Sequence, residues 1–249
     1  MDIINARGLT VGYGGTEVLR DLSFAIPESR ITVVLGVSGS GKSTLLKTLA
    51  GLLPPIKGGF DFSGSPVDYG SEASLRRLYG RIGVLYQGGA LLNGLTLFEN
   101  VALPVRMHYP ELPETIVGDM VHAGLAQVEM ADAAAKYPAE LSGGMRKRGA
   151  LARALVLDPD VVFCDEPSSG LDPITSSLLD DLLLRLKENF GMTLVVVTHE
   201  LRSIERVADE VLVIDDGGLR FAGDAAGLAA SDDAFVRTFF LKRDSHDDT

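Results

Sequence analysis

Apolar runs and helical periodicities alternate along this chain, and their order predicts an α/β fold. Residues 2–35 contain short β-type segments with a turn at 13–15, and they end in the apolar run Ile31–Leu35, which is long enough for a buried strand. Residues 42–53 then have helical spacing, and two prolines at 54–55 are expected to stop that helix. A strand, a glycine-rich turn and a helix in direct succession form half of a βαβ unit.

The middle of the chain continues this alternation around one long helical region. Residues 90–148 show helical patterns interrupted by prolines, without a strong strand signal, and we expect an inserted helical subdomain there. Beyond it, apolar β-branched runs at 161–165 and 193–197 flank a helical stretch at 173–189. This order is typical of a parallel sheet.

The C-terminal part predicts a hairpin and a short helical segment. A turn at 215–218 lies between two apolar runs and favours a late hairpin. In the helical segment at 226–243, we expect the apolar face to pack on the chain's own core, with docking on a partner subunit as the alternative. The apolar residues of that face are Phe235, Val236, Phe239 and Phe240. The acidic tail at 244–249 is predicted to be a solvated end.

Composition is compatible with one elaborated α/β domain, predicted to span residues 2–241. The chain has 249 residues, 46% of them hydrophobic, which is enough to bury a sizeable core. No stretch approaches the roughly 20 consecutive apolar residues of a membrane-spanning helix, and the N-terminus lacks a signal-peptide pattern, so we expect a cytoplasmic chain. The only cysteine, Cys164, lies in an apolar run and is predicted to be a core thiol of a reducing compartment.

The formal net charge of −11 narrows the range of partners. It argues against a broad electrostatic surface for nucleic acid or for anionic lipid. Any association with a membrane is therefore expected to go through a protein partner.

A glycine-rich segment between the predicted strand and helix matches the phosphate-binding loop pattern G-x-x-x-x-G-K-[ST]. Its residues are Gly36, Val37, Ser38, Gly39, Ser40, Gly41, Lys42 and Ser43, followed by Thr44. Glycines let backbone N–H groups turn inward around a β-phosphate, Lys42 reaches the β and γ oxygens, and Ser43 ligates Mg²⁺. The segment therefore predicts binding of a nucleotide.

An apolar strand that ends in two acids is the second element that phosphoryl transfer requires. Asp165 is predicted to hold Mg²⁺, directly or through water. The adjacent Glu166 is placed to polarise the attacking water as a general base. An Asp-Glu pair alone is more often an exposed loop acid, but after an apolar strand in a chain with a phosphate loop the catalytic interpretation is favoured.

The motif that separates this chain from other phosphate-loop proteins occupies residues 141–145, with the sequence Leu-Ser-Gly-Gly-Met. It precedes a helical run at 146–157, where Ser142 is a suitable N-cap and Gly143 and Gly144 expose backbone N–H groups that can bind an anion. The motif resembles the signature of ABC transporter ATPases. A capped helix is the simpler interpretation of the motif alone, but further segments follow the order of that family.

Four other residues resemble motif residues of the same family. Gln87 is similar to the Q-loop glutamine that contacts Mg²⁺ and water, and His199 to the switch histidine that contacts the γ-phosphate and supports the base. Residues 169–172 are similar to the D-loop, through which Asp172 reaches the ATP of a partner subunit. Tyr13 resembles the aromatic residue that stacks on adenine, with packing in the core as its alternative role.

This resemblance covers about residues 2–225 and implies the family's fold and mechanism. The fold is a P-loop NTPase (RecA-like) core at 2–89 and 149–225, which includes an N-terminal antiparallel β subdomain, and the helical subdomain is inserted at 90–148. Two copies face each other head to tail as a homodimer. Each ATP then lies between the phosphate loop of one copy and Ser142, Gly143 and Gly144 of the other. Closure of the dimer moves a separate permease through the helical subdomain.

Met145 indicates a subfamily, because most ABC ATPases carry glutamine there. Residues 142–148, together with 87–91, 98–104 and 172–175, are similar to the ATPases of Mla- or Mce-type phospholipid transporters. This resemblance implies an enzyme on the cytoplasmic face of the inner (plasma) membrane. It also implies an Mla-type permease, an Mce-domain lipid-binding protein and a small STAS-domain protein as partners.

Other interpretations stay open from the sequence. ATPases that serve amino-acid, lipoprotein or drug transporters share most of these motifs. A soluble ABC protein of DNA repair or translation would usually carry a long coiled-coil insertion, a second ATPase domain or basic surfaces. A kinase or GTPase would leave the segment at 141–145 unexplained, and the guanine-reading pattern Asn-Lys-x-Asp is missing from the sequence.

Overall fold

The computed structural model describes residues 1–241, in which strands and helices alternate. This description does not include the side chains of residues 201–202, 229 and 238–241. The strands are β1 (Asp2–Tyr13), β2 (Thr16–Pro27), β3 (Ile31–Leu35), β4 (Lys57–Phe62), β5 (Ser65–Pro66), β6 (Ile82–Leu85), β7 (Val161–Asp165), β8 (Thr193–Val197), β9 (Glu210–Asp215) and β10 (Gly218–Asp224). The α-helices are α1 (Lys42–Leu49), α2 (Glu72–Tyr79), α3 (Leu97–His108), α4 (Glu114–Gln127), α5 (Gly143–Leu155), α6 (Pro173–Phe190), α7 (Leu201–Val207), α8 (Ala225–Ala229) and α9 (Ala234–Leu241). Two 3₁₀ turns, η1 (Ala131–Ala133) and η2 (Pro138–Glu140), precede α5.

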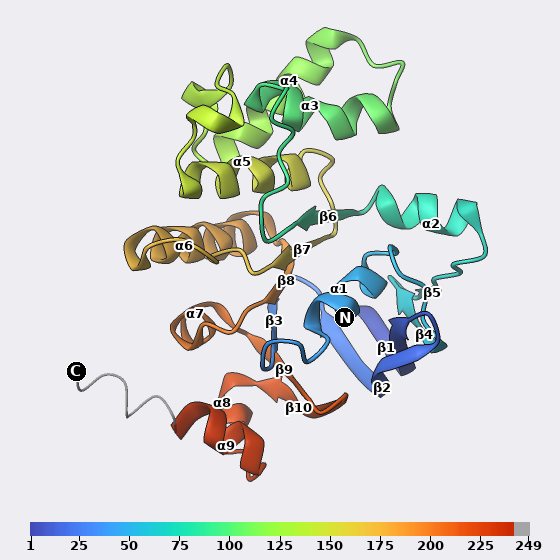
Figure 1. Cartoon of the computed structure of the whole chain (residues 1–249). Helices are drawn as coiled ribbons and strands as arrows, with labels where there is room; N and C mark the ends of the chain where they lie inside the picture. Colours follow the sequence, from blue (N-terminus) through green and yellow to red (C-terminus); the bar gives the residue numbers. More distant parts are fainter. Residues whose placement is uncertain (242–249) are drawn as a thin grey trace.

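Two sheets carry these elements and confirm the predicted α/β class. One sheet is antiparallel with the strand order β2-β1-β4-β5, and the other has the order β10-β9-β3-β8-β7-β6. All neighbouring strands of the second sheet are parallel except β9 and β10. Figure 1 shows helices α3, α4 and α5 at the top, α6 and α7 on one flank, and the antiparallel sheet on the other.

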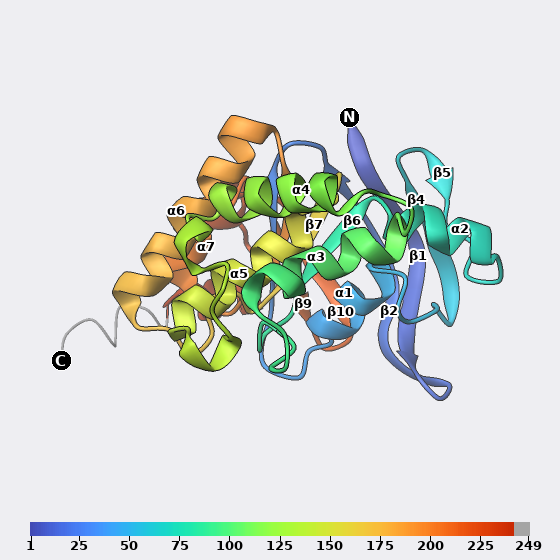
Figure 2. The same cartoon turned by 90° about the horizontal axis from the view of Figure 1, so that it is seen from above.

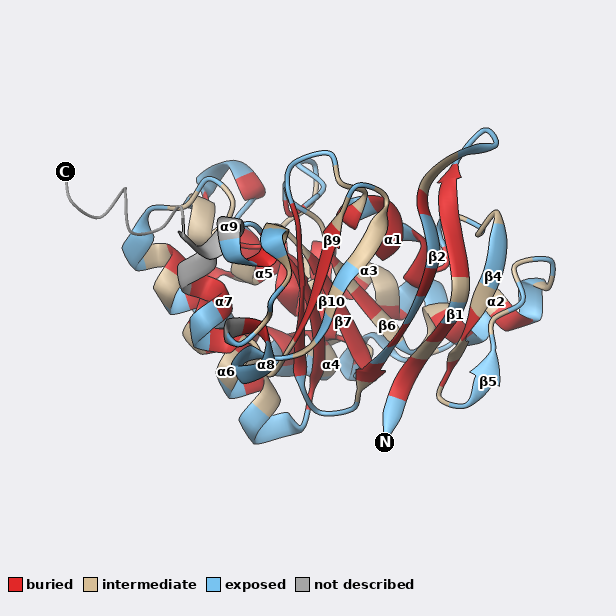
Figure 3. Ribbon diagram, turned by 90° about the horizontal axis from the view of Figure 1, so that it is seen from below, coloured by how far each residue is buried: buried red, intermediate tan, exposed pale blue. Residues whose placement is uncertain are grey.

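The parallel sheet separates two hydrophobic cores, because successive side chains of each strand point to opposite faces. On one face, Val34 and Phe163 pack with the antiparallel sheet and α1. On the other, Val33 and Val196 pack with helices α3 to α7. The runs predicted as strands at 31–35, 161–165 and 193–197 are confirmed, and Figure 3 shows the central strands as buried.

The N-terminal β segments are longer than the sequence predicted. Strands β1 and β2 have 12 residues each, joined by a turn in which Gly14 and Gly15 have positive φ. Their pairing register shifts at several points, for example between Ala6 and Leu9. Such bulges interrupt the period-two alternation of apolar residues, so one long strand looks like several short ones in the sequence.

Helix ends also differ from the predictions by a few residues. Helix α1 ends at Leu49 and not at 53, because Gly51 adopts a left-handed φ of 75° before the two prolines are reached. Helix α5 begins directly after Ser142, as the capping prediction requires, but ends at Leu155 and not at 157. The late hairpin is confirmed, and its turn residues Asp216 and Gly217 both have positive φ, as a two-residue turn of type I′ needs.

The helical region lies beside β6, the edge strand of the parallel sheet, and α5 packs against that strand (Figures 1 and 2). Its first helix, α3, begins with a reciprocal cap, in which the Thr96 side chain accepts from the Glu99 N–H and the Glu99 carboxylate accepts from the Thr96 N–H. The prediction of helices without strands at 90–148 is confirmed for the secondary structure.

The C-terminal helices α8 and α9 follow the hairpin, where the sequence predicted a helical segment. Val236 is buried and Phe235 is partly buried against the larger core, so these two residues pack on the chain itself. The side chains of Phe239 and Phe240, and the tail at 244–249, lie outside the described part of the chain. Across residues 1–241, none of the helices is both long and apolar enough to span a bilayer.

Candidate functional site

The phosphate-loop segment connects the end of β3 to the start of α1. Gly39 and Gly41 have φ values of 82° and 100°, a conformation that side-chain-bearing residues rarely adopt. At Gly36 a Cβ atom would lie 2.3 Å from the carbonyl oxygen of Ile214, so this glycine is required by close packing on β9. The loop therefore has a fixed backbone that ends at the N-terminus of a helix, a geometry suited to an anion.

Lys42 points back over this loop. Its Nζ donates to the carbonyl oxygens of Gly36 at 2.8 Å and Val37 at 2.9 Å, and the residue is only 7% exposed. Burial lowers the pKa of the ammonium group, and the nearby carboxylates of Glu166 and Asp165 act in the opposite direction. A phosphate that enters the loop would replace these two carbonyl partners with stronger, charged acceptors.

A cavity of about 490 Å³ opens above the loop and collects most of the residues predicted for nucleotide binding and hydrolysis. Its lining residues are Val18, Ser38, Gly39, Gly41, Lys42, Ser43, Thr44, Gln87, Glu166 and His199. These residues come from β2, the phosphate loop and the loops after β6, β7 and β8. Ligands of open α/β sheets bind at this edge, where the carboxyl ends of parallel strands meet.

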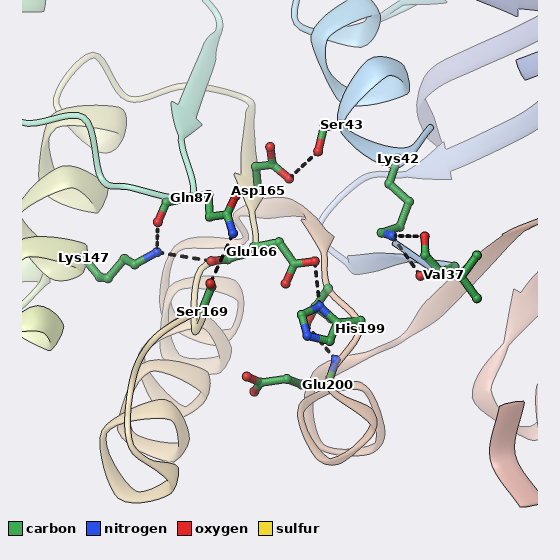
Figure 4. Close-up of polar contacts among 12 residues, drawn as sticks. Val37, Lys42, Ser43, Gln87, Lys147, Asp165, Glu166, Ser169, His199 and Glu200 are labelled. Atoms are coloured by element: carbon green, nitrogen blue, oxygen red, sulfur yellow. Dashed lines mark hydrogen bonds and ion pairs between the residues drawn. The ribbon is translucent and has the colours of Figure 1, made fainter. Parts of the chain in front are cut away.

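Glu166 and His199 form a carboxylate–imidazole pair in this cavity. Oε1 of Glu166 lies 2.9 Å from Nδ1 of His199, and the glutamate side chain is 13% exposed while the histidine ring is 56% exposed (Figure 4). The second carboxylate oxygen of Glu166, Oε2, is buried and has no hydrogen-bond partner among the described residues. A carboxylate with one hydrogen-bonded oxygen and one oxygen without a partner can accept a proton from a water bound beside it.

Ser43 and Asp165, the residues predicted to hold a metal ion, lie within hydrogen-bond distance of each other. The Ser43 hydroxyl donates to Oδ1 of Asp165 at 3.0 Å, across the space between α1 and the end of β7 (Figure 4). A hydroxyl and a carboxylate are hard oxygen ligands of the kind that Mg²⁺ prefers, and Mg²⁺ commonly takes its other ligands from water and substrate phosphates. Within residues 1–241 no cluster of three or more His, Cys, Asp or Glu side chains is suited to a metal. The Ser43 hydroxyl and the Asp165 carboxylate fit a metal that takes its remaining ligands from a nucleotide and water.

Gln87 reaches the same cavity from the loop after β6. Its side-chain Nε2 donates to the Ser169 hydroxyl at 3.3 Å. Gln87 therefore links the cavity to segment 169–172, which is similar to the D-loop. Its predicted contact with Mg²⁺ stays a prediction.

Ser142 caps α5 as predicted, since its Oγ accepts from the N–H of Met145 at 3.2 Å. A Cβ atom on Gly144 would lie 2.5 Å from the Thr175 side chain, so the start of α5 packs tightly against the start of α6. Among the described residues that line the cavity, the signature-like segment 141–145 is not represented. Within one chain, this segment and the phosphate loop thus belong to different surfaces.

Asp172 is already engaged within its own chain. Its Oδ1 accepts from the N–H groups of Ile174 and Thr175 at 3.1 and 3.0 Å, so the residue caps α6. The hydrogen bond from the Thr175 side chain, followed by that from the Thr175 backbone, lowers the pKa of the Asp172 carboxyl. Contact of Asp172 with the ATP of a second copy stays a prediction.

Tyr13 lies at the end of β1, beside the phosphate-loop helix. It is 48% exposed, and Nζ of Lys47 lies 6.0 Å from the centre of its ring. Such exposure contradicts the alternative in which Tyr13 is a core packing residue. It does not line the cavity described above, and its stacking on adenine stays a prediction.

Three residues near the site were not predicted as site residues from the sequence. Val18 lines the cavity, and Lys147 and Arg153 of α5 bind carbonyl groups of the loop after β6. A signal for Lys147 was present, because it shares a helix face with the buried residues Ala150 and Leu151 at i+3 and i+4. A lysine at a core-facing position needs polar partners, and here they are backbone carbonyls.

Comparison with known proteins agrees with this geometry. The family model described as "ABC transporter" matches residues 19–169. A Haemophilus influenzae relative named "Intermembrane phospholipid transport system ATP-binding protein MlaF" is 38% identical over 98% of this chain and 92% of its own length. A Mycobacterium tuberculosis relative named "Probable ribonucleotide transport ATP-binding protein mkl" is also 38% identical, over 96% of this chain and 67% of its own length.

Solved structures give the same result for the fold. The cbiO1 protein of Clostridium perfringens, described as part of the ABC transporter complex cbiONQ, has a TM-score of 0.85 at 28% identity and covers 97% of this chain and 99% of its own. A dimeric ATP-binding cassette, MJ0796, bound to ADP and Pi in a post-hydrolysis state, has a TM-score of 0.79 at 28% identity and covers 89% of this chain and 98% of its own.

Proposed function

This chain belongs to the ABC transporter family as an ATP-hydrolysing subunit, and on that premise we propose that two copies of it power a membrane permease that moves phospholipid. The proposal has three parts: the roles of the site residues, the pairing of two copies, and the transported substrate. Each part is supported by a different observation.

The observation that carries the hydrolytic part is the convergence of four distant motifs on one cavity. Lys42, Gln87, Glu166 and His199 line the same space of about 490 Å³ although they come from four separate loops. A random glycine-rich turn would not collect a lysine, an amide, a carboxylate and an imidazole around itself. The arrangement has the groups that phosphoryl transfer to water requires.

In the proposed reaction, the loop N–H groups and Lys42 hold the phosphates, and Ser43 and Asp165 hold Mg²⁺. When bound, Mg²⁺ neutralises charge on the β and γ oxygens. Glu166 orients and deprotonates the attacking water, and His199 fixes the carboxylate through the 2.9 Å contact to Nδ1. Gln87, which lines the same cavity, orients the same water.

A second copy completes the site. Ser142 is exposed at the start of α5, where the helix N-terminus favours an anion, and it lies outside the cavity of its own chain. In a head-to-tail dimer with two-fold symmetry, Ser142, Gly143 and Gly144 of one copy bind the γ-phosphate held by the other. The dimeric cassette with ADP and Pi supports this pairing as a precedent among similar structures.

The permease docks, in this proposal, in an apolar groove of about 420 Å³ between the helical region and the core. Tyr86, Leu103, Pro104 and Met107 contribute to its walls, and Met107 is 73% exposed. An exposed apolar groove of this kind is suited to a helix of another protein. In this proposal, docking in the groove holds the chain at the cytoplasmic face of the inner membrane through its partner.

Phospholipid is the proposed substrate because a relative that matches 98% of this chain over 92% of its own length carries that name. Met145 and its neighbours 142–148 support the same subfamily. The Mycobacterium relative makes ribonucleotide transport the second candidate, since its identity to this chain is equal. An Mce-domain lipid-binding protein and a STAS-domain protein are proposed partners in the phospholipid case.

A purification from the native cell tests the proposal. A tagged full-length chain is solubilised in mild detergent, and the captured proteins and lipids are identified by mass spectrometry. We expect a permease, an Mce-domain protein and bound phospholipid, and ATP-dependent transfer of labelled phospholipid after reconstitution into vesicles. A captured permease that takes up labelled ribonucleotide and does not transfer phospholipid would contradict the lipid proposal. Ribonucleotide transport, the second candidate, would then replace it.

A further inference from the structure

A buried lysine joins two functional loops of the site. Lys147 lies on α5 and is only 6% exposed. Its Nζ donates to the carbonyl oxygen of Gln87 and, at 3.2 Å, to the carbonyl oxygen of Glu166 (Figure 4). One ammonium group thus binds the backbones of two residues, Gln87 and Glu166, whose side chains both line the cavity.

The backbone of Glu166 needs such support because its conformation is uncommon. Its φ is 48°, in the left-handed region, which residues with a Cβ atom rarely adopt. Three hydrogen bonds hold it there. The Glu166 N–H donates to Val197 at 2.9 Å, and the Glu166 carbonyl accepts from the Ser169 N–H at 3.2 Å and from Lys147.

These bonds determine where the carboxylate points. A residue that returned to the right-handed or extended region would turn its Cα–Cβ bond away from the present direction. The 2.9 Å contact between Glu166 and His199 could then not form with the same geometry. The side-chain direction of the proposed base therefore depends on its carbonyl partners.

Lys147 is more costly to keep in this place than an apolar residue would be. Burial lowers the pKa of its ammonium group, and the carboxylates of Glu166 and Asp165 oppose that change. A core that needed only volume would be served by methionine or leucine at this helical position. The charged donor at this position therefore needs an explanation beyond packing.

Helix α5, which carries Lys147, also carries residues of two proposed interfaces. Helix α5 begins at Ser142, the residue proposed to meet the ATP of a second copy. Farther along the same helix, Arg153 donates to the carbonyls of Gly89 and Ala90 at 2.9 and 2.7 Å and also lines the proposed permease groove. One helix thus carries the residue proposed to meet the second copy, a residue of the proposed permease groove, and the lysine that binds the backbone of the proposed base.

We propose that Lys147 is a positioning residue for hydrolysis, which fixes the backbone of Glu166 and ties the direction of its carboxylate to the position of α5. The inference rests on the proposed function of Glu166 as the base. A shift of α5 would be transmitted through Lys147 to both Gln87 and Glu166. Lys147 touches no reacting atom itself, and it acts through the carbonyl groups of these two residues.

The test compares Lys147→Met, Lys147→Arg and Lys147→Gln in the full-length chain with Mg·ATP, alone and co-purified with its membrane subunits. Methionine keeps most of the volume and removes all donors, arginine keeps several donors, and glutamine keeps an amide with shorter reach. We expect Lys147→Met to lower kcat by about 10-fold or more, with KM for ATP within about twofold of wild type. Lys147→Arg should recover much of the lost kcat.

The matched control is Arg148→Met, one residue farther along the same helix. Arg148 makes a 3.4 Å ion pair with Glu129 at the surface, and its loss should leave kcat within about twofold of wild type. Wild-type kcat in Lys147→Met would overturn the inference, as would equal loss in the control. A parallel change of kcat and KM in all three Lys147 variants would indicate a structural role only and would also overturn it.

Two further measurements keep the result decisive. Thermal unfolding shows whether Lys147→Met folds. If it does not, the test is the kcat of Lys147→Arg relative to that of Lys147→Gln. We expect kcat to be at least about threefold higher for the arginine variant, and equal values would refute the inference. Wild type and Glu166→Gln are assayed in parallel. A wild type without ATPase activity, or a Glu166→Gln variant with it, would overturn the proposed function itself. An active wild type together with Lys147 variants of unchanged kcat would overturn only this inference.

Discussion

The Nδ1 atom of His199 lies 2.9 Å from Oε1 of Glu166, across 33 residues of sequence. The two residues follow adjacent parallel strands, β7 and β8, whose carboxyl ends place both side chains at the same edge of the sheet. This contact gives the carboxylate a fixed direction above the phosphate loop. It is the relationship on which the proposed chemistry depends.

Replacement of Glu166 by glutamine should abolish turnover and preserve ATP binding. The amide keeps the shape of the carboxylate but cannot accept the proton of water, so we expect kcat to fall by at least about 100-fold. Size-exclusion chromatography with Mg·ATP should show the variant as a stable dimer, since the bound ATP is not consumed. The control is Glu72→Gln on α2, whose exposed ion pair with Arg76 lies outside the cavity. Turnover near the wild-type rate would exclude Glu166 as the base.

Removal of the His199 ring should affect the same step as removal of the carboxylate. We expect His199→Ala to lower kcat by about 10²-fold, because the base loses its fixed orientation. In the double variant with Glu166→Gln, the two losses should not add, since residues that act as a unit are non-additive. The control is His122→Ala on α4, an exposed ring that contacts Phe98. Additive losses in the steady-state assay would show that the two residues act independently.

Ser43→Ala should raise the Mg²⁺ concentration needed for half-maximal hydrolysis. The variant loses one of the proposed oxygen ligands, so we expect a shift of about 10-fold or more, while excess chelator should stop hydrolysis by wild type altogether. Titration of Mg²⁺ at fixed ATP measures the shift. Ser65→Ala on the exposed strand β5 is the control for a lost serine hydroxyl. An unchanged Mg²⁺ requirement in Ser43→Ala would contradict the assigned metal site.

Stability should fall at alkaline pH because of Cys164. Burial raises the pKa of this thiol to about 12, whereas an exposed thiol titrates near pH 8.5. Below the unfolded value the thiol is protonated in both states and has no effect on the pH dependence. Between the two values only the unfolded chain loses the proton, so the free energy of unfolding decreases as pH rises, by up to about 1.4 kcal/mol per pH unit.

Urea unfolding of wild type and Cys164→Ala between pH 8 and pH 10.5 measures this effect. The alanine variant starts from a lower stability because of its cavity, but its slope with pH should be shallower. Parallel slopes for the two proteins would contradict a protonated core thiol. In the folded wild type, iodoacetamide at pH 8 should also fail to modify Cys164, because the thiol is fully buried.

The sequence predicted those strands and loops whose structure is specified by residues close together along the chain. Gly39, Gly41 and Lys42 belong to a pattern whose backbone geometry is specified within a few residues, so the phosphate loop could be predicted. The buried strands β3, β7 and β8 are continuous apolar runs, and the structure has them at the predicted bounds. The capping role of Ser142 likewise depends only on its neighbours along the chain.

Tertiary contacts are the part that could not be predicted. The role of Lys147 depends on Gln87, 60 residues away in sequence, and on Glu166, 19 residues away. Strands β1 and β2 looked short because bulges interrupt their alternation, and pairing between the strands decides where they end. The capping contacts of Asp172 with Ile174 and Thr175 are local, whereas the family resemblance implies a contact of Asp172 with a partner's ATP.

The most direct test of a site shared by two copies is a mixing experiment with Lys42→Ala and Ser142→Asp. Aspartate still caps α5, but its charge repels the γ-phosphate, so each variant alone should be inactive. Random pairing at equal amounts makes half of the dimers mixed, and each mixed dimer has one intact site of two, so about a quarter of the wild-type ATPase rate should return. A mixture that hydrolyses ATP no faster than the sum of the separate variants would contradict the shared site.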